Sequence, residues 1–255
     1  MSSFGPKLEG KVALITGAGS GVGRAMAELF SQHGCKVIVV DILPDRVNQV
    51  VTKIGSKNAT GMVGDLSTKE HVEKVIDDAY SSEGRVDILC NNAGIMDGVT
   101  PVAETSDELW QRVLNVNLNA PFWASRRVIP RMLKDGHGII LNTASVASFF
   151  AGKSGAAYAV SKHGLIGLTK SIAVFYGDKG IRCNAMVLGA VNTAIGLGGT
   201  NPSPLGLELM KKSTITIPRM AEPQEIAKLA LFLVTDESSY VNGSCVVIDG
   251  GWSAV

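Results

Sequence analysis

Near its N-terminus the sequence reads Val12-Ala-Leu-Ile-Thr16 and continues directly into Gly17-Ala-Gly-Ser-Gly-Val-Gly23. The first five residues have the apolar, β-branched character of a buried strand, and a helical pattern begins near Gly21. Closely spaced glycines between a strand and a helix let the backbone approach a pyrophosphate, which the free N–H groups of the helix can bind. The spacing departs from the usual G-x-G-x-x-G fingerprint, because residue 24 is Arg. The stretch predicts a phosphate-binding turn; a glycine turn without a ligand is the alternative.

Short apolar strands and longer helical patterns alternate along the rest of the chain. Further strands are expected at 36–40, 60–64, 86–90, 138–143, 181–187 and 245–248, and helices at 44–54, 68–82, 105–133, 156–176 and 223–235. Strands that are apolar on both faces and separated by helices predict an α/β, Rossmann-like fold. Its sheet is expected to be doubly wound, mostly parallel and seven-stranded, with helices on both faces.

Two further features concern the organisation of the chain. Thr105-x-x-Glu108 has the spacing of a capping box and is expected to open the helix at 105–133. Residues 189–213 lack a clear period, which predicts a lid or substrate loop, with a disordered insertion as the alternative. No linker or repeat divides the chain, so residues 1–255 are expected to form a single dinucleotide-binding and catalytic domain.

The composition argues against several classes of partner. Hydrophobic residues make up 45% and charged residues 18%, and the formal net charge is +1, so neither nucleic acid nor a membrane surface is expected as a partner. No apolar run approaches the roughly 18 residues of a spanning helix. The four cysteines are far apart, which predicts buried thiols, no metal site and a reducing, cytoplasmic location. The four histidines are expected at surface or boundary positions.

Asp41 ends the second predicted strand, 18 residues after Gly23. A carboxylate at this point can accept hydrogen bonds from the adenosine ribose hydroxyls of a dinucleotide. It would repel a 2′-phosphate by about 4 kcal/mol at ~4 Å and an effective dielectric near 20. Neither Ser20 nor Ile42 is basic, so NAD is expected as the cofactor and NADP is less favoured. The alternative is an ordinary solvated carboxylate.

Tyr158-Ala-Val-Ser-Lys162 places a phenol and an ammonium four residues apart. On a helix they lie on one face, about 6 Å apart along the axis. A phenol has an unperturbed pKa near ~10, and a neighbouring Lys⁺ together with the positive nicotinamide ring is expected to lower it. Tyr158 can then act as a general acid or base. The motif alone is common in helices, and its weight comes from the glycine turn upstream.

With both motifs in view, the sequence resembles the short-chain dehydrogenase/reductase family over roughly residues 7–252. The matching segments are Thr16-Gly-x-x-x-Gly-x-Gly23, Asp65-Leu66, Asn91-Asn-Ala-Gly94, Val116-Asn117-Leu118, Ser145, Tyr158-x-x-x-Lys162 and Asp249-Gly-Gly251. One departure is Leu188-Gly189, where the family usually has Pro-Gly. Without that proline, the start of the lid is expected to be looser.

The resemblance implies hydride transfer between NAD(H) and a secondary alcohol or ketone. It implies that Ser145 steadies the substrate oxygen, that Lys162 also holds the nicotinamide ribose, and that Asn117 completes a water-linked proton relay. Pro121 has no N–H, so the carbonyl of Asn117 lacks its usual helix partner and is free to hold a water; an incidental kink is the alternative. The motifs and the resemblance together give these cofactor-binding candidates: Thr16, Gly17, Gly19, Ser20, Gly21, Val22, Gly23, Asp41, Ile42, Asp65, Leu66, Asn91, Ala93, Gly94, Tyr158, Lys162, Gly189, Val191 and Thr193.

An apolar wall is expected around the reacting carbon, which favours a neutral, partly hydrophobic substrate. Its candidates are Ile95, Met96, Val146, Phe149, Phe150, Gly189, Ala190, Leu197, Leu205 and Leu207, although core packing is an equal alternative for the two phenylalanines. The helix at 156–176 is apolar on more than one face, and the resemblance implies that it pairs in a homodimer or homotetramer.

Two other functions stay open. A 3-oxoacyl-[acyl-carrier-protein] reductase usually goes with NADPH, which Asp41 disfavours. A non-catalytic dinucleotide sensor commonly lacks Ser, Tyr or Lys from the site, whereas this chain has Ser145, Tyr158 and Lys162.

Overall fold

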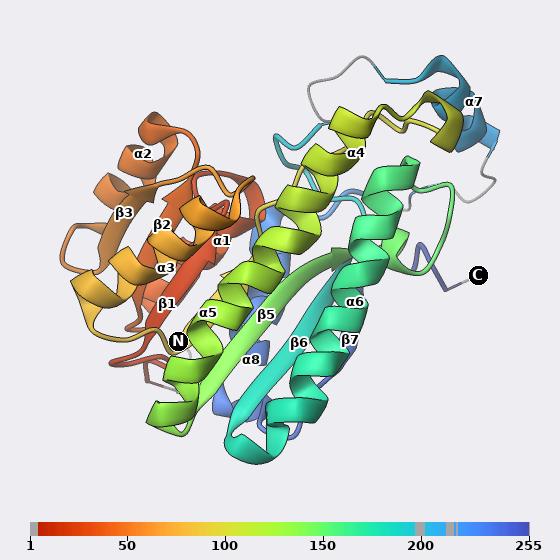
Figure 1. Cartoon of the computed structure of the whole chain (residues 1–255). Coiled ribbons are helices and arrows are strands. Elements are labelled where there is room, and N and C mark those ends of the chain that lie inside the picture. The colour runs from red at the N-terminus through yellow and green to blue at the C-terminus, as the bar shows by residue number, and fades with distance from the viewer. Residues whose placement is uncertain (1–4, 197–201, 213–216, 218, 255) are drawn as a thin grey trace.

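A computed structural model describes residues 5–196, 202–212, 217 and 219–254. Seven parallel strands form one sheet in the order β3-β2-β1-β4-β5-β6-β7 (Figure 1). The strands are β1 (Val12–Thr16), β2 (Lys36–Asp41), β3 (Ala59–Val63), β4 (Ile88–Asn91), β5 (Gly138–Ser145), β6 (Ile181–Leu188) and β7 (Cys245–Ile248). The predicted Rossmann-like, doubly wound fold is confirmed.

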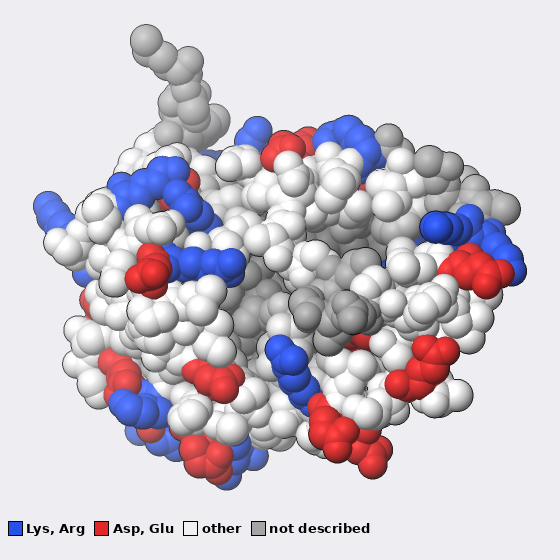
Figure 2. All heavy atoms as spheres, turned by 90° about the horizontal axis from the view of Figure 1, so that it is seen from above, with Lys and Arg blue, Asp and Glu red and all other residues white. Residues whose placement is uncertain are grey.

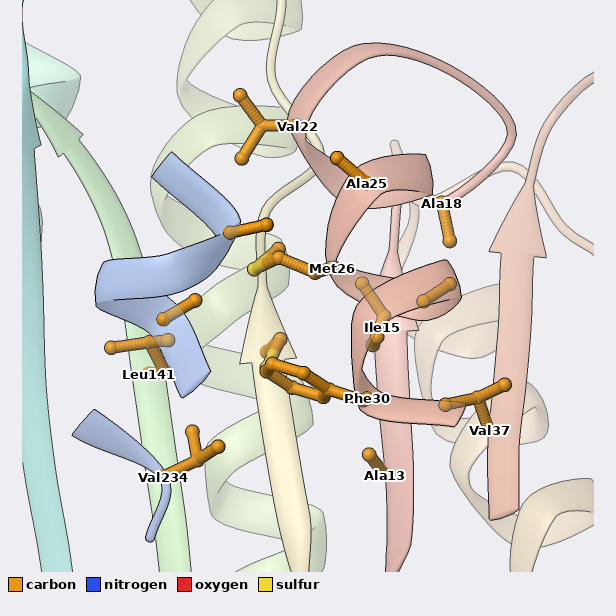
Figure 3. Close-up of a cluster of buried hydrophobic side chains, with 14 of the residues drawn as sticks. Ala13, Ile15, Ala18, Val22, Ala25, Met26, Phe30, Val37, Leu141 and Val234 are labelled. Carbon is orange, nitrogen blue, oxygen red and sulfur yellow. The ribbon is translucent and has the colours of Figure 1, made fainter. Parts of the chain in front are cut away.

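Helices cover both faces of this sheet (Figure 1). They are α1 (Gly21–Gln32), α2 (Pro44–Ile54), α3 (Lys69–Glu83), α4 (Asp107–Leu114), α5 (Ala120–Asp135), α6 (Ala156–Tyr176), α7 (Pro204–Lys212) and α8 (Pro223–Leu233). One buried cluster joins α1, α2 and α8 to the sheet, and a second joins α3, α5 and α6 to the other face. In the first cluster, Met26 and Phe30 of α1 point toward the sheet and are fully buried (Figure 3). Burying such a side chain contributes about 1.5–3 kcal/mol.

The helix expected at 105–133 differs from the prediction in two ways. Its cap is Ser106, whose hydroxyl accepts the Leu109 N–H at 3.2 Å, whereas the hydroxyl of Thr105 donates to the carbonyl of Pro101 at 2.9 Å. The predicted cap was therefore wrong by one residue. The helix is also interrupted by a π-helical turn at Asn115–Asn119, between α4 and α5. This turn contains Asn117 and lies just before Pro121, which lacks an N–H, so the helix is distorted here as the alternative reading of Pro121 proposed.

The lid segment is more ordered than its sequence suggested. It contains α7, a helix that the sequence pattern did not predict; residues 197–201 and 213 lie outside the described residues. After Leu188, which stands where the family usually has proline, the backbone is hydrogen-bonded to neighbouring segments. The Gly189 N–H donates to the carbonyl of Ile248 at 3.0 Å. The Ala221 N–H donates to the carbonyl of Ala190, and the Ala221 carbonyl accepts the N–H of Asn192, both at 2.9 Å. These three backbone bonds fix the first residues of the lid without a proline.

The carboxyl ends of the strands lie toward the top of Figure 1, and Figure 2 looks down on that edge. Lys, Arg, Asp and Glu side chains of both signs are interspersed over this face, and no patch of one sign dominates it (Figure 2). Among the helices that the structure describes, none combines the length and apolar character that crossing a membrane requires. The same described residues contain no group of three His, Cys, Asp or Glu side chains placed to hold a metal ion.

Candidate active site

A cleft of about 630 Å³ opens over the carboxyl ends of the central strands. The sheet order changes direction between β1 and β4, and ligands of open α/β sheets bind in the crevice at such a switch point. Most of the sequence-predicted residues line this cleft: Gly17, Ser20, Gly21, Val22, Asp41, Ile42, Asp65, Leu66, Ala93, Gly94, Ser145, Tyr158, Lys162, Gly189, Val191 and Thr193. Residues separated by more than 170 positions in the sequence therefore meet in one site.

The glycines of the first turn are required by close packing. Gly17 and Gly21 have φ values of 63° and 52°, which favour glycine. A Cβ at Gly19 would lie 2.8 Å from Cγ of Asp41, and a Cβ at Gly23 would overlap the carbonyl of Gly17. Gly19 and Gly23 do not line the cleft themselves; they let its wall fold this tightly. Ser20 makes no side-chain bond to the first turn of α1, so those N–H groups stay available to a phosphate. The turn fits a dinucleotide.

Two predicted cofactor residues lie behind the cleft. The Thr16 hydroxyl accepts the N–H groups of Asn92 and Ala93, at 2.9 and 3.0 Å, and so ties the end of β1 to the end of β4. The Asn91 side chain turns into the interior, where its Nδ2 donates to Oδ1 of Asn142 at 2.9 Å. Asn92 lines the cleft instead. The placement of Asn91 in the cleft was wrong because successive side chains of a strand point to opposite faces.

Asp41 is held at the cleft by two backbone groups. Its carboxylate accepts the N–H of Gly19 and of Leu43, each at 3.1 Å. Sequence reasoning missed a cation at this end of the cleft, Arg46 on α2, whose guanidinium lies 3.5 Å from the Ser20 hydroxyl. The sequence offered a signal for this cation: Arg46 lies in the first turn of α2, which begins at Pro44, three residues after Asp41. The argument from Ser20 and Ile42, neither of which is basic, therefore left Arg46 out of account.

Ser145, Tyr158 and Lys162 converge on the other half of the cleft. Ser145 ends β5 and lines the cleft beside Tyr158 of α6, and its hydroxyl accepts the N–H of Ala147 at 3.2 Å. Lys162 is 3% exposed; its Nζ donates to the carbonyl of Thr143 at 2.8 Å and lies 5.5 Å from the Tyr158 ring centroid. The three side chains thus share one wall of the cleft, as the motifs predicted.

The protonation behaviour of this group differs from the expectation. Burial raises the pKa of Tyr158 to about 12; the hydrogen bond with Ser145 acts in the opposite direction, and the negative charge of Asp97 adds to the rise. Burial also lowers the pKa of Lys162 to about 8. The predicted lowering of the phenol pKa is therefore not a property of the protein alone, because loss of hydration is the largest influence on Tyr158 and raises its pKa.

Asn117 is completely buried beside the site. Its side chain pairs with both backbone groups of Ile95, at 2.8 and 2.9 Å, and donates to the Ser161 hydroxyl at 3.2 Å. It thereby holds the segment after β4 against α6. A Cβ at Gly94 would sit 3.4 Å from the Asn117 side-chain oxygen and 3.5 Å from Nζ of Lys162. Asn117 is thus in the layer directly behind the cleft.

The apolar wall was only partly predicted. Ile95 and Gly189 line the cleft, joined by Ala144, Leu188 and Ile195. Phe149 and Phe150 pack edge to face against each other with centroids 6.5 Å apart, are 43% and 39% exposed, and lie outside the lining. The other candidates that do not line it are Met96, Val146, Ala190, Leu205 and Leu207; Leu197 lies outside the described residues.

Comparison with known proteins agrees with this geometry. The family model described as enoyl-(acyl carrier protein) reductase matches residues 17–253. A 3β-hydroxysteroid dehydrogenase of Eggerthella lenta is 38% identical over 253 residues, which span 98% of this chain and 97% of the relative. The chain belongs to the short-chain dehydrogenase/reductase family. It is accordingly an oxidoreductase of the class that acts on alcohols and carbonyl compounds.

Two further members of the short-chain dehydrogenase/reductase family show how broad the likeness is. A 3-oxoacyl-[acyl-carrier-protein] reductase of Thermotoga maritima is 37% identical over 252 residues, covering 96% of this chain and 98% of the relative. A crystal structure from Beutenbergia cavernae, described as an NAD(P)-dependent gluconate 5-dehydrogenase with NADP bound at low occupancy, is 37% identical. It matches with a TM-score of 0.86 over 98% of this chain and 100% of its own.

Proposed function

We propose that this short-chain dehydrogenase/reductase transfers a hydride between NAD(H) and a neutral, partly apolar secondary alcohol or ketone, in one domain spanning residues 1–255. The observation that carries the proposal is the convergence of Ser145, Tyr158 and Lys162 in the cleft that also contains the glycine turn. When bound, the nicotinamide supplies or accepts the hydride. The glycine turn would hold the pyrophosphate, Asp65 would bind the adenine amino group, and Val191 and Thr193 would contact the carboxamide and the pyrophosphate.

The three side chains have complementary proton chemistry. With a pKa of about 12, Tyr158 carries its proton at neutral pH and can donate it to a ketone oxygen. The Ser145 hydroxyl would hold that oxygen and stabilise the charge that develops on it. The Lys162 ammonium would bind the ribose and favour the phenolate once the proton has left. Asn117, which braces Ile95 and Ser161, would support the proton relay.

We propose NAD as the preferred cofactor. Asp41 supports this preference, because its carboxylate stands where a 2′-phosphate would have to enter. Arg46 acts in the opposite direction by placing a cation beside Ser20. The fixed carboxylate outweighs the more exposed guanidinium, because Asp41 is bound by two backbone N–H groups. We expect kcat/KM to be about 10–100-fold higher with NADH than with NADPH.

Initial rates over a panel of ketones, with NADH and with NADPH, test the proposal. The panel contains cyclic and acyclic neutral ketones, an acidic ketone and a 3-oxoacyl thioester. Neutral apolar ketones with NADH are expected to be the best combination. Tyr158→Phe should lower the rate roughly 10²–10⁴-fold and leave dinucleotide binding intact. Preference for the thioester with NADPH would favour the acyl-carrier-protein reductase, and binding without turnover would favour the sensor.

We also propose a homo-oligomer, a dimer or tetramer, in the cytoplasm. Val160, Val174 and Phe175 are exposed on α6, and Phe122 is exposed on α5. Exposed apolar side chains gathered on two long helices are typical of a surface that a second copy covers. The four cysteines are unpaired, which fits a reducing compartment. Sedimentation analysis of the wild type and of Val174→Lys tests the assembly, and the variant is expected to dissociate.

A further inference from the structure

The first turn of α6, which carries Tyr158, is capped from outside the helix. Gly155 occupies the N-cap position and has no side chain to offer. Its N–H donates to Oδ1 of Asp97 at 3.0 Å, and the N–H of Tyr158 donates to Oδ2 of the same carboxylate at 2.9 Å. The N–H of Ala156 donates to the carbonyl of Thr100 at 3.0 Å. The segment 97–100 thus takes the role that a Ser or Asp at the N-cap usually plays.

Asp97 is an unusual residue for a cap, because it is completely buried. Among the described side chains, no Lys, Arg or His forms an ion pair with it. Its charge is instead stabilised by the N–H groups of Val99, Gly155 and Tyr158 and by the positive end of α6. A Cβ at Gly155 would lie 2.5 Å from Asp97 Oδ2, so only glycine permits this contact.

The segment 97–100 also carries α7. Its Gly98 carbonyl accepts the N–H of Ser203, the residue before α7, at 2.9 Å. Val99, a buried residue with φ 58°, packs so closely on Gly206 of α7 that no Cβ fits there. A β-branched residue in this left-handed region is strained, and the surrounding contacts must hold it. One short segment therefore contacts the helix of Tyr158 on one side and the helix of the lid on the other.

We propose that Asp97 is a positioning residue, which fixes Tyr158 relative to Ser145 by capping α6 and which links α6 to α7 through the segment 97–100. The catalytic consequence rests on the proposed function, but the placement of the phenol does not. The charged side chains that line the cleft with the phenol are Lys162 on α6, Arg112 on α4, Arg46 on α2, Asp41 and Asp65, and Asp97 acts on the phenol from outside this lining. Of these, Asp97 is the one bonded to the backbone of Tyr158.

The negative charge of Asp97 gives the proposal a measurable signature. Its field raises the pKa of the Tyr158 phenol, so its removal should move the phenol titration to lower pH. A helix cap that served stability alone would not move that titration. We therefore compare Asp97→Asn and Asp97→Ala with Ser106→Ala, which removes the cap of α4 at 3.2 Å from the Leu109 N–H.

The titration is followed by NMR of protein labelled at tyrosine, with Tyr158→Phe used to assign the signal, and kcat/KM is measured against pH on the same samples. Both Asp97 variants are expected to lower kcat about 10–100-fold and to shift the phenol titration downward. Ser106→Ala is expected to do neither. Gly206→Ala, which pushes α7 away from Val99, is expected to raise KM several-fold and leave the titration unchanged.

The outcomes separate the two proposals. A wild-type protein without any turnover would refute the proposed function and leave the titration test of Asp97 in force. An unchanged titration, with kcat as in Ser106→Ala, would overturn the role of Asp97. If neither variant folds, hydrogen exchange of the wild type decides: slow exchange of the Gly155 and Tyr158 amides supports the cap, and fast exchange refutes it.

Discussion

Asp87, at the amino edge of the sheet, and Asp97, beyond its carboxyl edge, are both buried and both accept backbone N–H groups, but their surroundings differ. Asp87 accepts the N–H of Val12 at 2.8 Å and pairs with Arg85 and with His137, the latter at 2.7 Å. Asp97 has only backbone donors among the described residues. Lys162, buried on the same side as Asp97, likewise donates to a carbonyl rather than to a carboxylate.

The difference indicates that the cluster at the amino edge of the sheet serves stability, whereas the buried charges at the carboxyl edge serve the chemistry of the site. At the amino edge, the buried carboxylate of Asp87 is paired with Arg85 and His137, and this cluster closes the end of the sheet. At the carboxyl edge, Asp97 and Lys162 are both buried and both bond to backbone groups. Neither forms an ion pair with another described residue, and burying such charges costs stability. The shifted pKa values of that edge belong to Tyr158 and Lys162, the pair that the proposed proton transfer uses.

The largest effect is expected from Lys162→Met, which removes the buried cation and keeps the side-chain volume. We expect kcat/KM to fall roughly 10³-fold. The free energy of unfolding should stay the same or rise at neutral pH, because the wild type buries an ammonium that forms no ion pair with any described residue. Initial rates and urea unfolding of the same preparation measure both. A large loss of stability would contradict the separation between the two edges.

The same variant has a pH signature. The pKa of Lys162 is lowered by burial to about 8, so its ammonium is present below that pH and is lost as the pH rises through it. Wild-type kcat/KM should therefore decline above about pH 8, and the variant should lack this decline. Between the folded and unfolded pKa values only the unfolded chain holds this proton, so wild-type stability should rise with pH relative to the variant.

Asp87→Ala should give the reverse result at the amino edge. We expect the free energy of unfolding to fall by about 3 kcal/mol. This is the low end of the effect of breaking a buried ion pair, because Arg85 and His137 are partly exposed. The kcat/KM measured below the unfolding transition should not change. Urea unfolding of the variant checks the loss, with His137→Ala as a milder control.

The acid behaviour of Asp87 sharpens that result. Burial raises its pKa, but hydrogen bonds from Arg85, the Val12 N–H and His137 lower it by more, so the folded pKa lies below the usual range. Its contribution to stability is therefore full above the unfolded pKa of about 4 and is lost as the pH falls through the folded value. Asp87→Ala should lose less stability than the wild type over that range.

At the carboxyl edge, Asp41→Asn should change cofactor choice. It keeps an acceptor for the ribose and removes the charge that repels a 2′-phosphate, while Arg46 remains beside Ser20. We expect the ratio of kcat/KM for NADPH to that for NADH to rise about 10²-fold. Adding Arg46→Ala should cancel part of this gain. An unchanged ratio in Asp41→Asn would refute the role given to Asp41.

Short-range patterns predicted the fold and much of the site from the sequence. Strand and helix periods located the sheet, and the glycine turn and the Tyr158-Lys162 pair each lie within one element or at its end. The α7 helix was missed because its residues are surrounded by Gly, Pro and Ser. Choosing between Asn91 and Asn92 required the register of β4, which the sequence pattern did not settle.

Long-range contacts account for the rest. Asp97 bonds to residues 58 and 61 positions away, and nothing near it in the sequence marks it as a cap for α6. Arg46 reaches Ser20 across 26 positions. The raised pKa of Tyr158 follows from its burial, which depends on the packing of elements that the motif does not contain.

The smallest effect is expected from Ser106→Ala, which separates helix capping in general from the particular cap on α6. Ser106 caps α4 with its own hydroxyl at an exposed position. Its loss should cost about 1 kcal/mol of unfolding free energy and leave kcat within about twofold of the wild type. Urea unfolding and initial rates measure these two quantities. If this variant slowed turnover as much as Asp97→Asn does, loss of any nearby cap would explain both results, and the carboxylate behind Tyr158 would have no role of its own.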